Sequence, residues 1–329
     1  MDIALITPAG AGSRAGNRAT ATRWARFLRG LGHRVAVDVD YDGHRADLMI
    51  ALHAWRSAAA IRRFAAARAE APLVVVLTGT DIYRFQHTHP DTTRDSMARA
   101  DVLVGLHDRV AGDIPAEFRP KLCTVLQSAV PLARRAPAQR HFDVCVVGHL
   151  RDEKDSLRAA LAVRDVPAAS RLRVLQAGRA HNGDWEAAAH AEMAANPRYH
   201  WRGEIAHSEV RRLMARARLM VMSSRMEGGA NVVAEACMAG LPIVASDIPG
   251  NRGMLGDDYP GYYPVADTVA LREMLLRAER DAAFLGALGE ACRAQAPRFR
   301  PECERAALAD VIARACATNR SIANSARVL

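Results

Sequence analysis

The stretch that decides the fold is Ser224-Arg-Met-Glu-Gly-Gly-Ala-Asn-Val-Val-Ala-Glu-Ala-Cys-Met-Ala-Gly240, which lies between apolar, β-like runs at residues 219–223 and 241–245. A glycine pair follows Glu227, and an apolar helical run begins directly after it. The order strand, glycine turn, helix, strand is typical of a parallel α/β unit. Such a turn points free backbone N–H groups and the positive end of the helix dipole at any anion above it. The sequence therefore predicts an anion site at the start of this helix.

Two carboxylates of this stretch, Glu227 and Glu235, are eight positions apart. The helix around Glu235 is apolar on every side, so we expect it to be buried. A carboxylate there is costly unless hydrogen bonds or a cation satisfy it. Alternatively, Glu235 emerges at the helix edge or pairs with a structural arginine, and Glu227 is an ordinary loop acid.

The spacing of the two acids fits a nucleotide-sugar. Eight helical residues span about 12 Å, roughly the distance from a sugar to a ribose across a diphosphate. The ribose would then lie on Glu235 and the transferred sugar near Glu227. The diphosphate would lie on the backbone amides of the turn, which belong to Gly228, Gly229, Ala230 and Asn231.

Composition narrows the class of protein. The chain has 329 residues, of which 50% are hydrophobic and 25% charged, which is enough for two globular domains of about 150 residues each. The formal charge of +9 comes from arginines spread along the chain, with only two lysines and 5% aromatic residues, so we expect no nucleic-acid partner. We also expect no membrane association and no signal segment, and a cytoplasmic protein with reduced cysteines.

Two sets of alternating strand and helix signals divide the chain. In the first set we expect strands at residues 2–7, 34–39, 47–52, 73–77, 101–106 and 122–126, and helices at 17–31 and 55–71. In the second set we expect strands at 142–147, 173–176, 219–223 and 241–246, and helices at 209–217, 268–280, 283–295 and 302–317. The pattern predicts an α/β protein of two Rossmann-like doubly wound domains facing a cleft, residues 1–130 and 142–300, joined by a linker at 131–141.

A lysine follows the first strand of the second domain, in Gly148-His-Leu-Arg-Asp-Glu-Lys154. Lys154 is one of two lysines in an arginine-rich chain, so a compact point charge is favoured at this position. A cation at the carboxyl end of a strand suits a leaving diphosphate, and His149 and Arg151 could assist. The alternative is a solvated lysine paired with Asp152 or Asp155.

The first domain contains a glycine loop, Gly10-x-Gly12-x-x-x-Gly16. With Asp38 and Asp40 further along, this loop resembles a dinucleotide fingerprint, so a nicotinamide oxidoreductase is the distant alternative. The loop is one residue too long for that motif, and its polar groups suit a small anion instead. The sequence Asp38-Val39-Asp40 also matches an Asp-x-Asp metal-binding motif. We interpret it as the end of a strand and expect no metal or cofactor. The polar groups of this loop are Arg14, Asn17 and Thr20.

A second polar loop, Thr78-Gly79-Thr80-Asp81, follows the predicted strand at 73–77 and should face the same edge of the sheet. A hydroxyl acceptor benefits from a nearby base, whereas an acceptor that is already an anion does not need one. His53 ends the neighbouring strand and could act as that base, or it could be a hydrogen-bonded structural histidine. No other base is evident in this loop.

Glu227-x7-Glu235 resembles the signature of the retaining GT-B glycosyltransferases of family 4, in which the second Glu holds the ribose of a nucleotide-sugar. Lys154 matches the lysine of that family's Gly-Arg-x-x-x-x-Lys motif, and His149 replaces its arginine. The family's Gly-Phe-Gly is Gly228-Gly229-Ala230 here, and Thr78 replaces a frequent histidine. The resemblance implies a UDP-sugar donor site in the second domain, acceptor residues in the first, and a last helix (301–329) that crosses back to the first domain.

Within this family the runs 226–236, 16–17 and 78–83 are similar to the selenosugar synthase branch of selenoneine biosynthesis. That resemblance implies attack of selenophosphate on a UDP-sugar, with UDP-N-acetylglucosamine expected, and release of UDP and phosphate. It also implies a hand-off of the 1-seleno-sugar to a downstream biosynthetic enzyme. A conventional transfer to a hydroxyl acceptor is the alternative. The implied acceptor residues are Arg14, Gly16, Asn17, Thr20, His53, Thr78, Gly79, Thr80 and Asp81, and the catalytic pair is Glu227 and Lys154.

Overall fold

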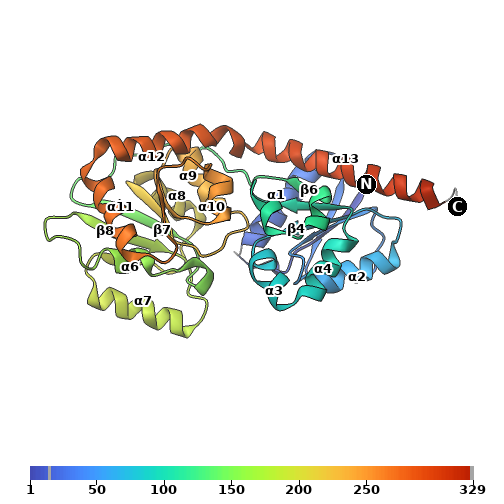
Figure 1. Cartoon of the computed structure of the whole chain (residues 1–329), viewed down its shortest axis with the longest axis horizontal. Helices are drawn as coiled ribbons and strands as arrows, with labels where there is room; N and C mark the ends of the chain where they lie inside the picture. The colour runs from blue at the N-terminus through green and yellow to red at the C-terminus, as the bar shows by residue number, and fades with distance from the viewer. Residues whose placement is uncertain (14–15, 327–329) are drawn as a thin grey trace. The chain divides into compact units, whose positions relative to one another are not determined.

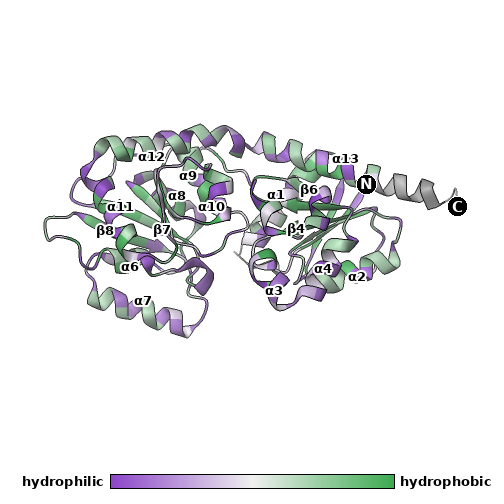
Figure 2. Cartoon of the chain, viewed as in Figure 1, coloured by the Kyte–Doolittle hydropathy of each residue, from purple (hydrophilic) through white to green (hydrophobic). Residues whose placement is uncertain are grey.

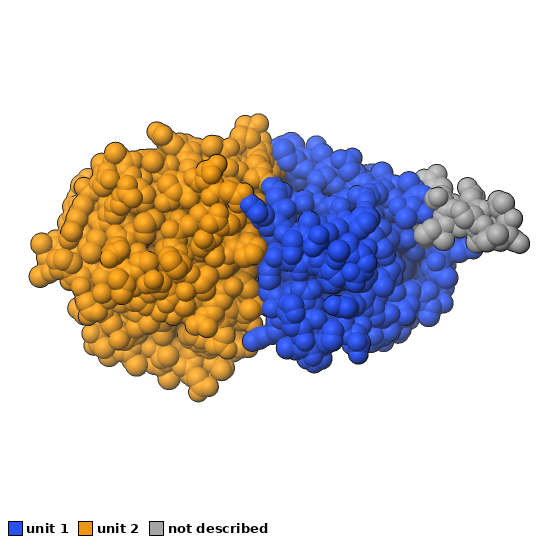
Figure 3. All heavy atoms as spheres, viewed as in Figure 1, with its two compact units in different colours: residues 1–127, 301–329 blue, residues 128–300 orange. Residues whose placement is uncertain are grey.

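The structure of the protein is a computed structural model that describes residues 1–13 and 16–326, with side chains up to residue 318. The chain forms two compact units, which are coloured separately in Figure 3. Unit 1 consists of residues 1–127 together with 301–329, and unit 2 consists of residues 128–300. The segment at 131–141 therefore groups with unit 2, and the last helix groups with unit 1.

Unit 1 is built on a parallel sheet, in which Figure 1 labels β4 and β6. Six strands form this sheet, in the order β2-β1-β3-β4-β5-β6. Its strands are β1 (Asp2–Ile6), β2 (Arg34–Asp38), β3 (Leu48–Leu52), β4 (Leu73–Leu77), β5 (Val102–Gly105) and β6 (Leu122–Thr124). Its helices are α1 (Gly16–Gly30), α2 (Ala58–Ala67), the π-helix η1 (Asp81–Phe85), α3 (Gln86–Thr88), α4 (Pro90–Arg99), α5 (Val110–Asp113), the 3-10 helix η2 (Ala116–Lys121) and α13 (Pro301–Ala326).

Successive strand residues of unit 1 pack on opposite faces of its sheet, because side chains alternate along a strand. On one face Leu5 and Ile50 pack with Trp24 of α1 and Leu308 of α13. On the other face Ala4 and Met49 join residues of α2 and α4. Strands β3, β4 and β5 are buried and apolar along their whole length, as expected for a covered parallel sheet, and the strand labelled β4 in Figure 2 is hydrophobic.

Unit 2 contains a second parallel sheet of order β12-β11-β10-β7-β8-β9. Its strands are β7 (Phe142–Val147), β8 (Leu172–Ala177), β9 (Tyr199–Trp201), β10 (Leu219–Met222), β11 (Ile243–Ser246) and β12 (Tyr262–Tyr263). Its helices are η3 (Asp152–Lys154), α6 (Arg158–Ala162), α7 (Gly183–Ala195), α8 (His207–Arg216), α9 (Asn231–Ala239), α10 (Pro249–Leu255), α11 (Thr268–Arg280), α12 (Ala282–Gln295) and η4 (Ala296–Phe299). This is the strand order of a dinucleotide-binding fold, whose switch point lies between β7 and β10.

Some elements differ from the sequence-based expectation. The helix expected at 55–71 is shorter, Ala58–Ala67, because residues 53–57 form a turn in which Ser57 Oγ donates to the carbonyl of Leu52 at 2.7 Å. Helix α7 was not expected, because only Ala189 and Glu192 of its residues are buried and its sequence carries no apolar stripe. In the described part of the chain, no helix is both long enough and apolar enough to cross a membrane.

Candidate functional site

Two loops of unit 2 meet at the carboxyl ends of β7 and β10. These strands pair in parallel, so the loops that follow them lie at one edge of the sheet, at the switch point where doubly wound folds bind ligands. Ser223 Oγ donates to the carbonyl oxygens of Lys154 at 3.0 Å and Asp155 at 3.1 Å, and the Arg225 N–H donates to the Glu153 carbonyl at 2.8 Å. The backbone thus fixes the Lys154 loop beside the Glu227 loop.

Lys154 and Glu227 form an ion pair in which the Lys154 ammonium donates to Oε1 of the carboxylate. Ser224 Oγ donates to the same oxygen at 2.5 Å. The Glu227 side chain is 8% exposed and that of Lys154 19% exposed. An ammonium has three donors, so Lys154 can hold Glu227 and still give hydrogen bonds to a ligand.

The start of α9 presents uncapped backbone donors next to this pair. Ala230 precedes the helix and gives no side-chain cap, while its own N–H contacts Met254 Sδ at 3.3 Å. The first N–H groups of a helix have no intrahelical partner, so they are available to an anion. Asn231 Oδ1 is buried and has no hydrogen-bond partner within the described structure. Such an atom requires a donor, and a ligand hydroxyl would supply one.

Glu235 is not fully buried, which corrects the expectation drawn from its apolar neighbours. Its side chain is 19% exposed, and Oε1 lies 3.2 Å from Nε2 of His207 at the start of α8. The flanking residues Ala234 and Ala236 are buried, so the acid emerges at the helix edge. Its hydrogen bond raises the pKa of His207. Glu227 is the more deeply buried of the two acids.

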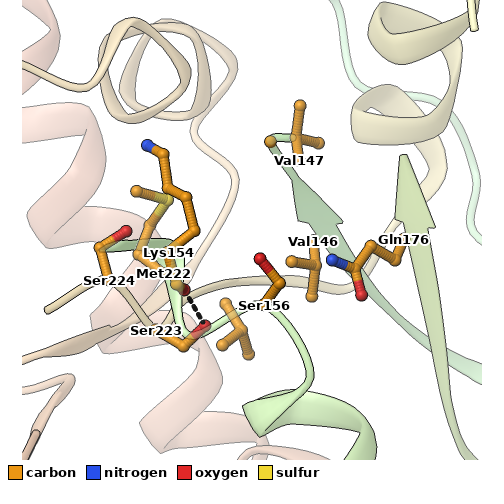
Figure 4. Close-up of a pocket in the computed structure, with 10 residues that line it drawn as sticks. Val146, Val147, Lys154, Ser156, Gln176, Met222, Ser223 and Ser224 are labelled. Atoms are coloured by element: carbon orange, nitrogen blue, oxygen red, sulfur yellow. Dashed lines mark hydrogen bonds between the residues drawn. The ribbon is translucent and has the colours of Figure 1, made fainter. Parts of the chain in front are cut away.

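His149 and Arg151 lie on the same loop as Lys154. Nδ1 of His149 accepts the backbone N–H of Arg179 at 3.1 Å, and burial lowers the pKa of His149. The neutral ring therefore has its proton on Nε2 and can donate from it. The Arg151 N–H donates to Ser156 Oγ at 3.0 Å. A small pocket opens beside this loop, lined by residues that include Gly148, Lys154, Gln176, Ser223 and Ser224 (Figure 4).

At the carboxyl edge of the unit 1 sheet, Asp81 ties two loops together. It is fully buried and accepts the backbone N–H groups of Ala54 at 3.1 Å, Thr78 at 3.0 Å, Gly79 at 2.7 Å and Ile82 at 3.2 Å. A carboxylate committed to four N–H groups is a structural anchor, so the expected direct contact of Asp81 with an acceptor is not supported. Thr78 and Thr80 are only half-buried.

The glycine loop of unit 1 is described in part. Gly16 begins α1 and Asn17 is half-buried, whereas Arg14 lies outside the described residues. Thr20 is buried, and its hydroxyl donates to the Gly16 carbonyl at 3.0 Å and accepts from Gln127 Nε2. This hydroxyl is committed inside the unit, which does not support direct acceptor contact by Thr20. No three His, Cys, Asp or Glu side chains gather as a metal-binding group in the described residues.

Three residues that sequence reasoning missed support the two acids. Ser224 donates to Glu227, His207 pairs with Glu235, and Gly250 of α10 packs on the Glu227 backbone. The position of Ser224, three residues before Glu227, is the signal that could have been used. His207 and Gly250 come from distant parts of the sequence, and no local pattern marks them.

Several solved structures share the fold of this chain. HepE from Anabaena, in complex with UDP and glucose, is 16% identical with a TM-score of 0.75, covering 95% of this chain and 99% of that chain. Sucrose-phosphate synthase from Thermosynechococcus elongatus is 13% identical with a TM-score of 0.77, covering 95% and 98%. TarM from S. aureus is 14% identical with a TM-score of 0.65, covering 91% and 58%. These likenesses confirm the GT-B fold expected from the sequence.

Residues 133–293, nearly all of unit 2, match the family described as Glycosyl transferases group 1. Unit 2 is therefore similar to the glycosyltransferase group 1 domains. A search of curated protein sequences found no match.

Proposed function

We propose that the protein is a retaining glycosyltransferase that takes its sugar from a UDP-sugar bound at the switch point of unit 2. The observation that carries this proposal is the Lys154–Glu227 pair beside the uncapped start of α9. The family match of residues 133–293 supports it, and so do the complexes of HepE with UDP and with UDP-glucose.

Each group at this site has a proposed role. Lys154 and the amides of residues 228, 229 and 231 neutralise the charge that develops on the leaving diphosphate, whereas the Ala230 N–H, also expected there, already contacts Met254 Sδ. His149 donates from Nε2 and Arg151 adds positive charge. Glu235 accepts the ribose hydroxyls. Glu227 positions the transferred sugar, and the buried Asn231 Oδ1 accepts one of its hydroxyls. Because a lysine and a helix start supply the positive charge, we propose that transfer needs no metal.

The proposed acceptor is selenophosphate, and the proposed donor is UDP-N-acetylglucosamine. Selenium attacks the anomeric carbon, the carbon–selenium bond forms, and the bond from that carbon to the UDP oxygen breaks. UDP leaves with the bonding electrons. Water then cleaves the phosphorus–selenium bond, so phosphate is released and a 1-seleno-sugar remains for a downstream enzyme. The sequence resemblance of residues 16–17, 78–83 and 226–236 supports this choice.

Incubation of the purified protein with UDP-N-acetylglucosamine and selenophosphate, followed by mass detection, tests the proposal. We expect UDP, phosphate and a 1-seleno-N-acetylhexosamine. Parallel reactions replace the donor by UDP-glucose and the acceptor by glycerol. A product with glycerol and none with selenophosphate would assign the protein to hydroxyl transfer instead, and no donor consumption in any reaction would refute both.

A further inference from the structure

Asp155, the residue after Lys154, has a backbone conformation that is unusual for its type. It follows the 3-10 helix η3 with φ 46° and ψ 51°, in the left-handed region. Glycine adopts this region without steric cost, whereas a residue with a side chain is strained there, and aspartate is strained less than most. Strained residues persist where the surrounding structure enforces them, and they cluster at functional sites. A glycine would make the same turn at lower cost, so the role of Asp155 lies in its carboxylate.

The carboxylate of Asp155 joins its loop to other elements of unit 2. Nε and Nη2 of Arg158, in α6, donate to its two oxygens at 2.8 Å and 3.2 Å. Nη1 of the same guanidinium donates to Oγ1 of Thr268, at the start of α11, at 2.6 Å. On the loop between β10 and α9, Nη2 of Arg225 lies 3.7 Å from Oδ1 of Asp155. One carboxylate thus connects the loop after β7 with α6, with α11 through Arg158, and with the loop after β10.

The pair with Arg158 is the stronger of the two ion pairs. The side chains of Asp155 and Arg158 are 12% and 16% exposed, whereas that of Arg225 is 53% exposed. Two parallel hydrogen bonds between a guanidinium and a carboxylate fix geometry as well as adding energy. An exposed ion pair contributes little. Arg158 therefore determines the orientation of the Asp155 side chain.

The backbone at the same position is fixed against the loop that carries Glu227. Ser223 Oγ donates to the carbonyl oxygens of Lys154 and Asp155, and Figure 4 shows the first of these hydrogen bonds. The side chain of Asp155 is held by α6 while its carbonyl is held by Ser223. Because Lys154 directly precedes this residue, both anchors determine where the ammonium that pairs with Glu227 lies.

We propose that Asp155 is a positioning residue whose carboxylate holds Lys154 in place for the diphosphate of the donor. This inference rests on the proposed UDP-sugar site of unit 2. A loop that is already ordered does not have to be ordered when the ligand binds, so the anchor increases affinity without touching the ligand. Removing the carboxylate should therefore weaken the binding of the diphosphate and leave the binding of the nucleoside unchanged.

Titrations with UDP by calorimetry and with uridine by ligand-observed NMR test this inference, with melting temperature as a check of folding. Asp155→Asn keeps the shape of the side chain and its tolerance of the left-handed region, and it removes the charge. The Kd for UDP should rise by about 10-fold, the loss of one hydrogen bond to a charged group, and the Kd for uridine should stay unchanged. Asp155→Gly, which also relieves the backbone strain, should lose the same affinity for UDP.

Two comparisons separate positioning from a general effect on the fold. In a Lys154→Ala background, Asp155→Asn should change the Kd for UDP by less than about 2-fold, because a residue that acts through Lys154 has nothing left to position. Ala266→Gly is the matched control. Ala266, also in unit 2, has a left-handed φ of 62°, so glycine relieves the same kind of strain there without removing a charge. This variant should bind UDP as the wild type does.

Other results would overturn the inference. An Asp155→Gly variant with wild-type affinity for UDP would show that the residue serves the turn alone. Equal weakening of UDP and uridine would show a general distortion of unit 2, and a full additional loss in the Lys154→Ala background would show that Asp155 does not act through Lys154. Failure of the proposed function is distinguishable from all three, because the wild-type protein would then bind no UDP, and the inference would fall with it.

Discussion

Gly250, in the first turn of α10, packs directly on the backbone of Glu227, and its replacement by alanine is a sharp test of the site. A Cβ at this position would lie 2.3 Å from the Glu227 carbonyl oxygen and 2.9 Å from its Cβ. The first distance is about 1 Å shorter than ordinary van der Waals contact. The obstacle is mainly backbone, so either α10 or the Glu227 loop has to move.

The expected losses of turnover and stability follow from this displacement. A misplacement of about 1 Å in a catalytic site can cost about 100-fold in rate, so Gly250→Ala should lower turnover by that order. Forcing a methyl group into a packed region typically costs about 1–3 kcal/mol of stability. The assay is UDP release from a UDP-sugar under saturating donor and acceptor, with thermal unfolding measured alongside.

Gly286→Ala is the matched control. Gly286 lies in α12 of the same unit, and a Cβ there meets nothing within 4 Å. The substitution should leave turnover unchanged and stabilise the protein by about 0.4–1 kcal/mol, because alanine restricts the unfolded chain. If Gly250→Ala matched Gly286→Ala in both turnover and stability, the inferred positioning of Glu227 by α10 would be refuted.

Further predictions concern two residues of the proposed UDP-sugar site, the last helix and His207. Lys154→Ala and Glu235→Ala should each lower turnover at least about 100-fold in steady-state assays, and near-normal rates for both would reject the site. Glu304 is 1% exposed and accepts hydrogen bonds from Arg23 at 2.8 Å and Trp24 at 2.7 Å. Glu304→Ala should therefore lower the free energy of unfolding by about 3 kcal/mol. An unchanged midpoint of denaturant unfolding would contradict this. The pKa of His207 should be raised in an NMR titration and fall in Glu235→Gln. Because that pKa is raised on folding, the pair stabilises the fold below the ordinary histidine value of about 6.5 and loses its effect as pH rises through the raised value.

The sequence predicted the parallel α/β architecture well, because buried strands such as Leu73–Leu77 are continuous apolar runs that end at turn residues. It missed α7, whose few buried residues leave no periodic signal. The start and end of α2 were predicted less accurately than the strands, because the helix was expected at 55–71 and runs from Ala58 to Ala67. The turn at residues 53–57 depends on His53 taking a positive φ, which no local pattern requires.

The contacts among the candidate site residues could not be predicted from the sequence. Lys154 was expected to serve a phosphate or to pair with a neighbouring aspartate, and the structure pairs it with Glu227, 73 positions away. The sequence also left open whether Glu235 is buried or emerges at the helix edge, and its side chain is 19% exposed. Burial depends on which elements cover a side chain. Glu235, at the edge of α9, contacts His207 of α8, and this contact joins residues that lie 28 positions apart in the sequence.

We propose that the switch point of unit 2 binds the nucleoside diphosphate of a sugar donor. Calorimetric titration of the wild-type protein with UDP tests it most directly, with Lys154→Ala and Glu235→Ala titrated in parallel. We predict saturable one-to-one binding to the wild type and clear weakening in each variant. Absence of UDP binding to the folded wild type, or equal affinity in all three proteins, would contradict the claim.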